Sequence, residues 1–279
     1  MSLFHPNFEA KDSQPLPKSR GSQIFFLLKN HFLVLFFSSL TYFVFTIPLL
    51  LLLLSFHFQY TSLLQSENPD ANSLFILLLI AGSLFAIALT IVGIGSAGMN
   101  GVVAKLMIDN DAAYKDFWIA IKEHWLRFLF YYLILGIFVF LVFATYGVYF
   151  YREFNAAMKL ISLIIACLFL FLYCLGKPYF LLECFYFENG FFSSIKASIF
   201  FGLGGLFLNV ALLIASNGLY LAMLFSPIIG ISIEMTLEIL LGGALTSLLN
   251  LEFGMMRLEK TVGIETLGSL YRKGLGPER

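Results

Sequence analysis

Residues 93–127 read GIGSAGMNGVVAKLMIDNDAAYKDFWIAIKEHWLR, and they lie between two long apolar runs. The first part of this stretch is rich in small residues. The last part has the spacing of an amphipathic helix and holds both tryptophans of the chain, Trp118 and Trp125. We interpret the stretch as a cytosolic hinge of a protein that crosses a membrane several times, because the flanking apolar runs are long enough to span the hydrocarbon core.

The composition of the chain is that of a membrane protein. Hydrophobic residues make up 59% of the 279 residues and charged residues only 12%, whereas a soluble domain carries about 25% charged residues. The formal net charge is zero, so no nucleic-acid partner is expected. We therefore predict an all-α fold, a polytopic bundle of transmembrane helices whose main partner is the lipid bilayer.

Six apolar runs are long enough to cross the bilayer, which takes about 20 residues of helix. The sixth run contains Glu234 and Glu238. Together the runs define a transmembrane domain at 24–256, which we expect to lie between a disordered cytosolic tail at 1–23 and a second cytosolic tail at 257–279. The predicted spans cover residues 32–56, 73–97, 128–150, 160–182, 199–225 and 228–251.

The basic residues predict the orientation of these spans, since loops on the cytoplasmic side collect Lys and Arg. With six spans and both termini inside, every Lys and Arg except Arg152 and Lys159 falls on the cytoplasmic side. Five spans would move the basic carboxyl-terminal tail to the outside. We therefore expect a multi-pass protein of the bacterial cytoplasmic (inner) membrane with both termini in the cytoplasm.

Small residues recur every four positions at the start of the opening stretch. Gly93, Ala97 and Gly101 share one helix face, and small residues at this spacing let two helix backbones approach closely in lipid. The letters at Gly93, Gly95 and Gly98 also match the dinucleotide-binding pattern G-x-G-x-x-G. That pattern requires a preceding strand in a βαβ unit, whereas an apolar run of helix length precedes it here. We interpret the glycines as a helix-packing surface.

The second part of the stretch predicts an amphipathic elbow helix that leads into the third span. Trp118 and Trp125 follow helical spacing on its apolar face, while Lys122 and Arg127 fall on the other face. One interpretation is a docking surface for a cytosolic partner, formed by these four residues. The other is a helix in the headgroup layer, anchored by its tryptophans and with lysines directed toward lipid phosphate.

A second segment is similar to this elbow in outline. Residues 188–201 read ENGFFSSIKASIFF, in which Phe192 corresponds to Trp118 and Lys196 to Lys122. Both segments follow a predicted span that enters the cytoplasm and precede one that leaves it. The match indicates two related hairpins, as found in membrane proteins built from repeats.

Glu234, Glu238 and Asn209 are the candidate polar residues inside the predicted spans, where polar side chains commonly mark functional sites. One hypothesis is a proton- or cation-coupled cavity between the last two helices. The alternative is that the last helix begins near Leu237, which would place both acids in the outer headgroup layer.

The order of these features resembles the YesL-like family of uncharacterised bacterial membrane proteins. The resemblance is carried by GIGSAGMNGVVAKLM at 93–107 and YKDFWIAIKEHWLRF at 114–128, and it extends over most of 29–260. Family members usually have Gly-Pro-Ala at the turn, where this chain has Gly95-Ser96-Ala97. The resemblance implies a six-span inner-membrane protein, often linked to carbohydrate uptake systems, with no established catalytic residues.

Two classes of function follow from the sequence. A non-enzymatic accessory or scaffold protein of a transport system would use the elbow and the small-residue face to bind another membrane protein or a second copy. A small secondary transporter would use a polar path along the last two helices. The histidines and cysteines are scattered without ligand spacing or catalytic motif, so we expect no enzymatic activity, no metal and no cofactor.

Overall fold

The structure is a computed structural model that describes residues 16–66, 69–187, 189–223, 232, 236 and 242–276, without the side chains of 217–223 and 266. This part of the chain is all-helical, as predicted. Its elements are α1 (Arg20–Asn30), α2 (Phe32–Leu64), α3 (Ala71–Asp109), α4 (Lys115–Tyr151), α5 (Ala156–Tyr186), α6 (Phe191–Gly204), α7 (Leu206–Met223), α9 (Gly243–Leu267) and the short 3-10 helix η2 (Gly268–Leu270).

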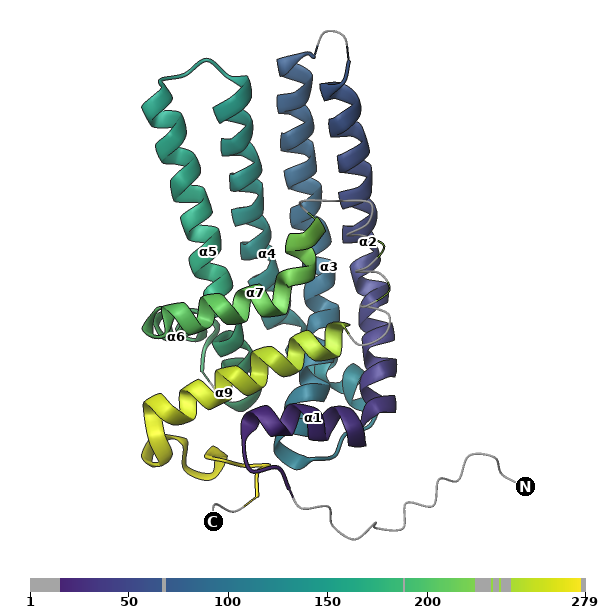
Figure 1. Cartoon of the computed structure of the whole chain (residues 1–279), viewed down its shortest axis with the longest axis vertical. Helices are drawn as coiled ribbons and strands as arrows, with labels where there is room; N and C mark the ends of the chain where they lie inside the picture. The colour runs from purple at the N-terminus through teal and green to yellow at the C-terminus, as the bar shows by residue number, and fades with distance from the viewer. Residues whose placement is uncertain are drawn as a thin grey trace, which may run out of the picture.

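The four longest helices, α2 to α5, stand upright beside one another as two antiparallel hairpins (Figure 1). They have 31 to 39 residues and are apolar enough to cross a membrane, and each is longer than the stretch of about 20 residues that a crossing takes. Polar caps start two of them. Asp70 accepts hydrogen bonds from the first backbone N–H groups of α3, and Asn155 does the same for α5.

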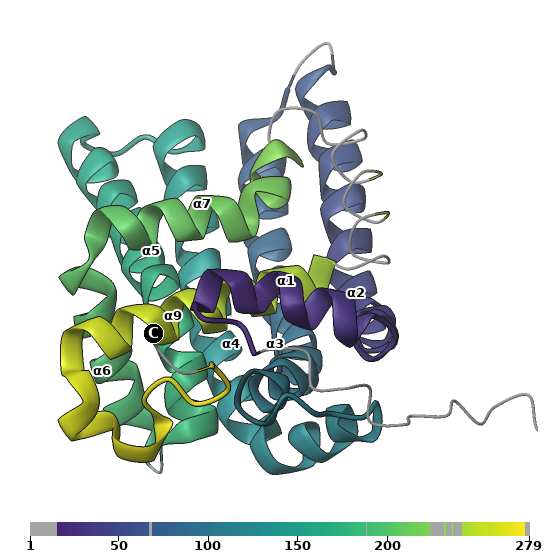
Figure 2. The same ribbon diagram turned by 60° about the horizontal axis from the view of Figure 1, so that its bottom comes forward.

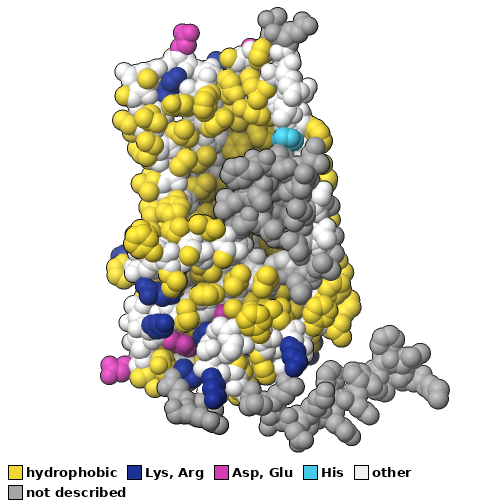
Figure 3. All heavy atoms as spheres, in the orientation of Figure 1, with side chains coloured by type: hydrophobic (Ala, Val, Ile, Leu, Met, Phe, Trp, Pro, Cys, Tyr) yellow, Lys and Arg dark blue, Asp and Glu magenta, His cyan; other side chains and the backbone are white. Residues whose placement is uncertain are grey.

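The lower end of the bundle in Figure 1, which we call the base, is formed by α1, α9, the last turns of α3 and α5 and the first turns of α4. Figure 2 shows α1 beside α9 at this end. The N–H of Gly276 donates to the carbonyl of Pro17 at 3.0 Å, so the two described ends of the chain meet at the base. Figure 3 shows Lys and Arg side chains gathered there, below a broad apolar surface.

Two predicted elements differ from the structure. The elbow and the third span form one continuous helix, α4, because no proline interrupts 115–151. The fifth span, predicted at 199–225, is not one rod: α6 and the described part of α7 meet at Gly205 with a bend of 105°. Hydropathy cannot register this bend, because the residues on both sides of it are apolar.

The boundaries of other regions also differ. Two helices run past the ends of the predicted spans 32–56 and 73–97, because α2 continues to Leu64 and α3 to Asp109. Residues 20–23, assigned to a disordered tail, begin α1, where Ser19 and Ser22 form a capping box. The fourth span is longer than 160–182, because α5 continues through Pro178 to Tyr186. Within the sixth predicted span, the described residues 232 and 236 are helical and residues 243–251 begin α9, which continues into the region assigned to the carboxyl-terminal tail. Glu234 and Glu238 lie outside the described residues.

Candidate functional site

The α3–α4 hairpin is held together by close contact of its two backbones. Gly93 and Gly101 face α4: a Cβ atom on Gly93 would lie 2.8 Å from the Cβ of Tyr132, and one on Gly101 would overlap Ala120. Ala97, on the same face between them, is fully buried. Small side chains at these positions therefore set the spacing of the two helices.

The hairpin turns at Asn110, which ends α3 in the left-handed conformation with φ of 53°, a conformation that Asn tolerates better than most residues. Asp116 then fixes the start of α4. Its Oδ2 accepts a hydrogen bond from the N–H of Ala113 at 2.7 Å, and its Oδ1 lies 2.9 Å from Nζ of Lys105. This carboxylate therefore stabilises the turn and ties α4 back to α3.

An open cleft of about 560 Å³ lies beside this turn, in the base. Its walls come from α3, α4, the end of α5 and the C-terminal segment. The Lys105–Asp116 ion pair forms part of one wall. Lys273 lies on another, with its Nζ 4.0 Å from Oδ1 of Asp109. Charged side chains of both signs therefore line the cleft.

Small and aromatic residues complete the lining of the cleft. The ring of His124 packs edge-on against Phe185 with 4.8 Å between ring centroids. The hydroxyl of Tyr186 donates to the carbonyl of Ala104 at 2.8 Å. In the described part of the chain, no group of three or more His, Cys, Asp or Glu side chains could hold a metal ion. The lining therefore offers ion-pair and hydrogen-bond partners beside apolar contact surface.

A buried ionic cluster lies elsewhere in the base, between α1 and α9. The guanidinium of Arg20 lies 2.6 Å from Oε1 of Glu259 and donates to Oε1 of Gln23 at 2.8 Å. Gln23 in turn donates to the carbonyl of Met107 at the end of α3, at 2.8 Å. These hydrogen bonds join three helices, so the cluster holds α1 on the base.

Glu252 is the unusual member of this cluster. Its side chain is only 1% exposed, and neither carboxylate oxygen has a hydrogen-bond partner among the described residues. Oε2 lies 3.8 Å from the guanidinium of Arg20, which is already engaged with Glu259. Burial raises the pKa of the Glu252 carboxyl to about 8; the attraction of Arg20 opposes this rise, and the charge of Glu259 adds to it.

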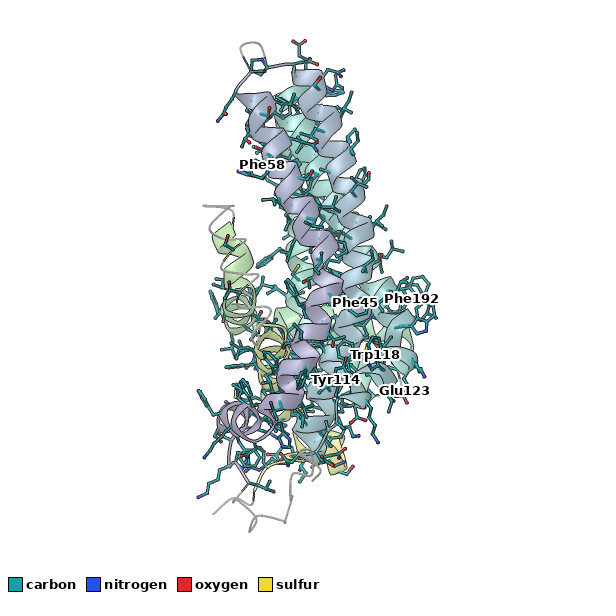
Figure 4. The ribbon with its side chains drawn as sticks, turned by 90° about the vertical axis from the view of Figure 1, so that its right-hand side faces the viewer. Phe45, Phe58, Tyr114, Trp118, Glu123 and Phe192 are labelled. Atoms are coloured by element: carbon teal, nitrogen blue, oxygen red, sulfur yellow. The ribbon has the colours of Figure 1, made fainter. Side chains whose placement is uncertain are left out.

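The predicted docking residues lie on α4, but not in the cleft. Trp118 and Trp125 are 45% and 44% exposed, Lys122 is exposed and Arg127 is half-buried. None of these four side chains lines the cleft. Phe117, the residue before Trp118, is fully buried. Figure 4 shows Trp118 and Glu123 on the lower part of the molecule.

Asn209, the described member of the predicted polar path, makes structural hydrogen bonds at the α6–α7 bend. Its amide donates to the carbonyl of Gly202 at 2.7 Å and of Phe201 at 3.3 Å. Its side-chain oxygen accepts from the hydroxyl of Tyr179 at 3.0 Å. The two carbonyls belong to the last turn of α6, where the helix leaves such groups without backbone partners. Asn209 therefore caps α6 and ties it to α5.

The cleft and the buried cluster were both missed by the sequence analysis. Lys105 and Asp116 lie on either side of the predicted hinge, so their opposite charges could have indicated a pair across it. Arg20 and Glu259 are 239 positions apart, and no local pattern relates them.

The chain matches none of the protein-family models, none of the curated proteins and none of the solved structures with which it was compared. The resemblance to the YesL-like family therefore stays a prediction.

Proposed function

We propose that this protein is a non-enzymatic accessory or scaffold component of the bacterial inner membrane that binds a partner of a transport system in the cleft of its base. The observation that carries the proposal is the cleft itself, an opening of about 560 Å³ between the ends of three long apolar helices. Its lining of small, aromatic and oppositely charged side chains provides contacts for a partner segment.

The proposal places the base in the cytoplasm. Lys and Arg gather at this end (Figure 3), as the positive-inside rule requires. The described ends of the chain meet there, so an even number of crossings separates them. We propose six: the four helices α2 to α5 and two crossings between α6 and α9. A reporter fused after Lys260 that proves to be extracytoplasmic would contradict this orientation.

Site-specific photo-crosslinking in living cells tests the docking function. A photoreactive phenylalanine analogue at Ile119, which lines the cleft, is expected to capture one defined protein. The matched control places the same analogue at Ile137, which is also exposed on α4 and lies farther along it. Capture at Ile137 is not expected, because its surroundings are lipid.

A charge reversal then separates recognition from folding. Lys273→Glu reverses a charge that lines the cleft and leaves the Lys105–Asp116 pair, which stabilises the turn, in place. The substitution is expected to weaken the crosslink at Ile119 while leaving the amount of protein in the membrane unchanged, because the side chain of Lys273 is exposed. No crosslink at Ile119 in the unaltered protein, together with solute uptake by the purified protein in liposomes, would favour the secondary transporter instead.

A further inference from the structure

The first turns of α4 and α6 each carry a pair of adjacent aromatic residues, Phe117-Trp118 on α4 and Phe191-Phe192 on α6. Phe117 and Trp118 are arranged edge to face, with centroids 5.4 Å apart and an interplanar angle of 75°. Phe191 and Phe192 have nearly the same geometry, at 5.5 Å and 72°. In each pair the first ring packs inward: Phe117 is fully buried, and Phe191 packs against the core near Phe180. The second ring projects outward.

The inward faces of the two helices are equivalent as well. Ala120 of α4 and Ser194 of α6 hold corresponding positions, and both are buried. Ala120 meets Gly101 of α3. On α6 the buried residues are Ser194, Ser198 and Gly202, and a Cβ on Gly202 would lie 3.1 Å from the carbonyl oxygen of Leu175 in α5. Each helix therefore packs small residues against the long helix that precedes it.

The outward faces repeat the same chemistry at every fourth residue. On α4 the exposed strip is Trp118, Lys122 and Leu126, and on α6 it is Phe192, Lys196 and Phe200. Each strip places one lysine between two apolar side chains on one helix face. The prediction that Lys122 lies on the face opposite Trp118 is therefore wrong, because residues four apart on α4 share a face. The apolar residues are strongly exposed, with 81% for Phe192 and 73% for Phe200. Figure 4 shows Trp118 and Phe192 on the same side of the molecule, in its lower half.

A lipid surface fits these strips better than water or a soluble protein does. On α6 Ser194 and Ser198 face inward while Phe192 and Phe200 face outward, which is the reverse of a helix on a water-soluble protein. The strips also adjoin the apolar surface of the upright helices, including the exposed side chains of Phe130 and Ile137 on α4. Aromatic rings favour the interface between hydrocarbon and headgroups, and lysine at that depth reaches lipid phosphate.

We propose that Trp118–Lys122–Leu126 and Phe192–Lys196–Phe200 form a paired contact surface for the anionic phospholipid headgroup layer of one leaflet. The aromatic rings insert at the interface, and the two ammonium groups bind phosphate between them. Because one strip lies on α4 and the other on α6, the two contacts together fix the depth and the tilt of the base relative to the membrane surface. The surface is distinct from the cleft, so it does not depend on the proposed docking function.

Tryptophan fluorescence tests the proposal, because the chain has only two tryptophans. The protein is reconstituted into vesicles of phosphatidylglycerol and phosphatidylcholine whose acyl chains carry bromine either near the headgroup or near the chain end. Three variants each contain a single tryptophan. Trp125→Phe leaves Trp118 as the only tryptophan. The other two combine Trp118→Phe and Trp125→Phe with either Phe192→Trp or Phe169→Trp. Phe169, an exposed residue within α5, is the mid-bilayer control.

The expected result is stronger quenching by bromine near the headgroup at positions 118 and 192, and by bromine near the chain end at position 169. In addition, Lys122→Glu with Lys196→Glu should lose the preference of the protein for phosphatidylglycerol over phosphatidylcholine in the lipids that co-purify with it, roughly five-fold per lysine. Lys115→Glu, a nearby exposed lysine outside both strips, should retain most of that preference.

Three outcomes would overturn the proposal. The absence of bromolipid quenching at positions 118 and 192, with position 169 still quenched, would mean that water or another protein covers the strips. Quenching at 118 without quenching at 192 would show that the two hairpins are not equivalent. An unchanged lipid preference in the double lysine variant would remove the role of phosphate.

Discussion

The Arg20 guanidinium lies 2.6 Å from the carboxylate of Glu259, and this contact fastens the first described helix to α9. Arg20 is buried, and the side chain of Glu259 is 10% exposed. Removing one member of a buried ion pair leaves the other charge without compensation. The contact therefore links the position of α1 to the integrity of the C-terminal helix, although no local sequence pattern connects them.

Arg20→Ala should destabilise the protein by about 3–5 kcal/mol, the usual cost of breaking a buried pair from one side. Both Glu252 and Glu259 would lose their cationic neighbour. Thermal unfolding in detergent measures the loss. Lys18→Ala is the matched control, since Lys18 precedes α1 with an exposed side chain, and it should unfold at the temperature of the unaltered protein. Equal stability of both variants would show that α1 is not held by this pair.

Glu252 should make the protein less stable as the pH rises. Because the pKa of its carboxyl is about 8 in the folded state and 4.5 in the reference state, the folded protein binds more protons between these values. The extra free energy of unfolding that this bound proton contributes is fully present below the lower value, and it is lost as the pH rises through the folded pKa. Between pH 6 and pH 9 the loss amounts to about 2–3 kcal/mol for this group.

Melting curves of the purified protein at both pH values check this dependence. Glu252→Gln keeps the shape of the side chain but cannot ionise, so it should reduce the decline with pH and melt higher than the unaltered protein at pH 9. Glu265→Gln removes an exposed acid that lies beyond the break in α9 at Gly263 and should leave the decline in place. A decline that is the same in the Glu252→Gln variant would rule out this carboxyl as its source.

Gly101→Leu should separate the α3–α4 hairpin. A Cβ at this position already overlaps Ala120, and a larger side chain forces the two backbones apart, at a cost of about 1–3 kcal/mol for overpacking. Gly21→Ala is the control, because no atom lies within 4 Å of a Cβ at Gly21, and alanine is the better helix former. Thermal unfolding should show a loss for the first variant and none for the second. If Gly101→Leu is tolerated, the close approach of these helices is not required for stability.

The sequence predicted the long helices of this fold well, because each apolar run exceeds the length needed to cross a bilayer. The small-residue face at Gly93, Ala97 and Gly101 was also visible, since its spacing is local. The bend at Gly205 was not predicted. Hydropathy averages over a window, and the chain is apolar on both sides of the bend. The hydrogen bonds of Asn209, which stabilise the bend, join residues that no local pattern relates.

The candidate site was harder to predict for a related reason. The cleft is built from segments as distant as Gly101 and Lys273, and a single sequence carries no signal that brings them together. The amphipathic pattern around Trp118 was visible, but periodicity could not distinguish a docking surface from a lipid-facing one. The lipid-facing role that we propose for it rests on α6, in which Ser194 and Ser198 are buried while Phe192 and Phe200 are exposed.

Asn209→Leu should destabilise the α6–α7 bend, because Asn209 is the side chain that satisfies two carbonyls of α6 and the hydroxyl of Tyr179. Leaving these groups without partners costs about 1–3 kcal/mol. Tyr179→Phe removes only the hydroxyl and should cost less, since the amide still caps α6. The two variants are compared by thermal unfolding and by solute uptake into liposomes. A structural cap predicts that Asn209→Leu melts lower than Tyr179→Phe. If instead Asn209→Leu melts like the unaltered protein and abolishes an uptake activity, Asn209 lines a transport path and the secondary-transporter hypothesis gains over the scaffold.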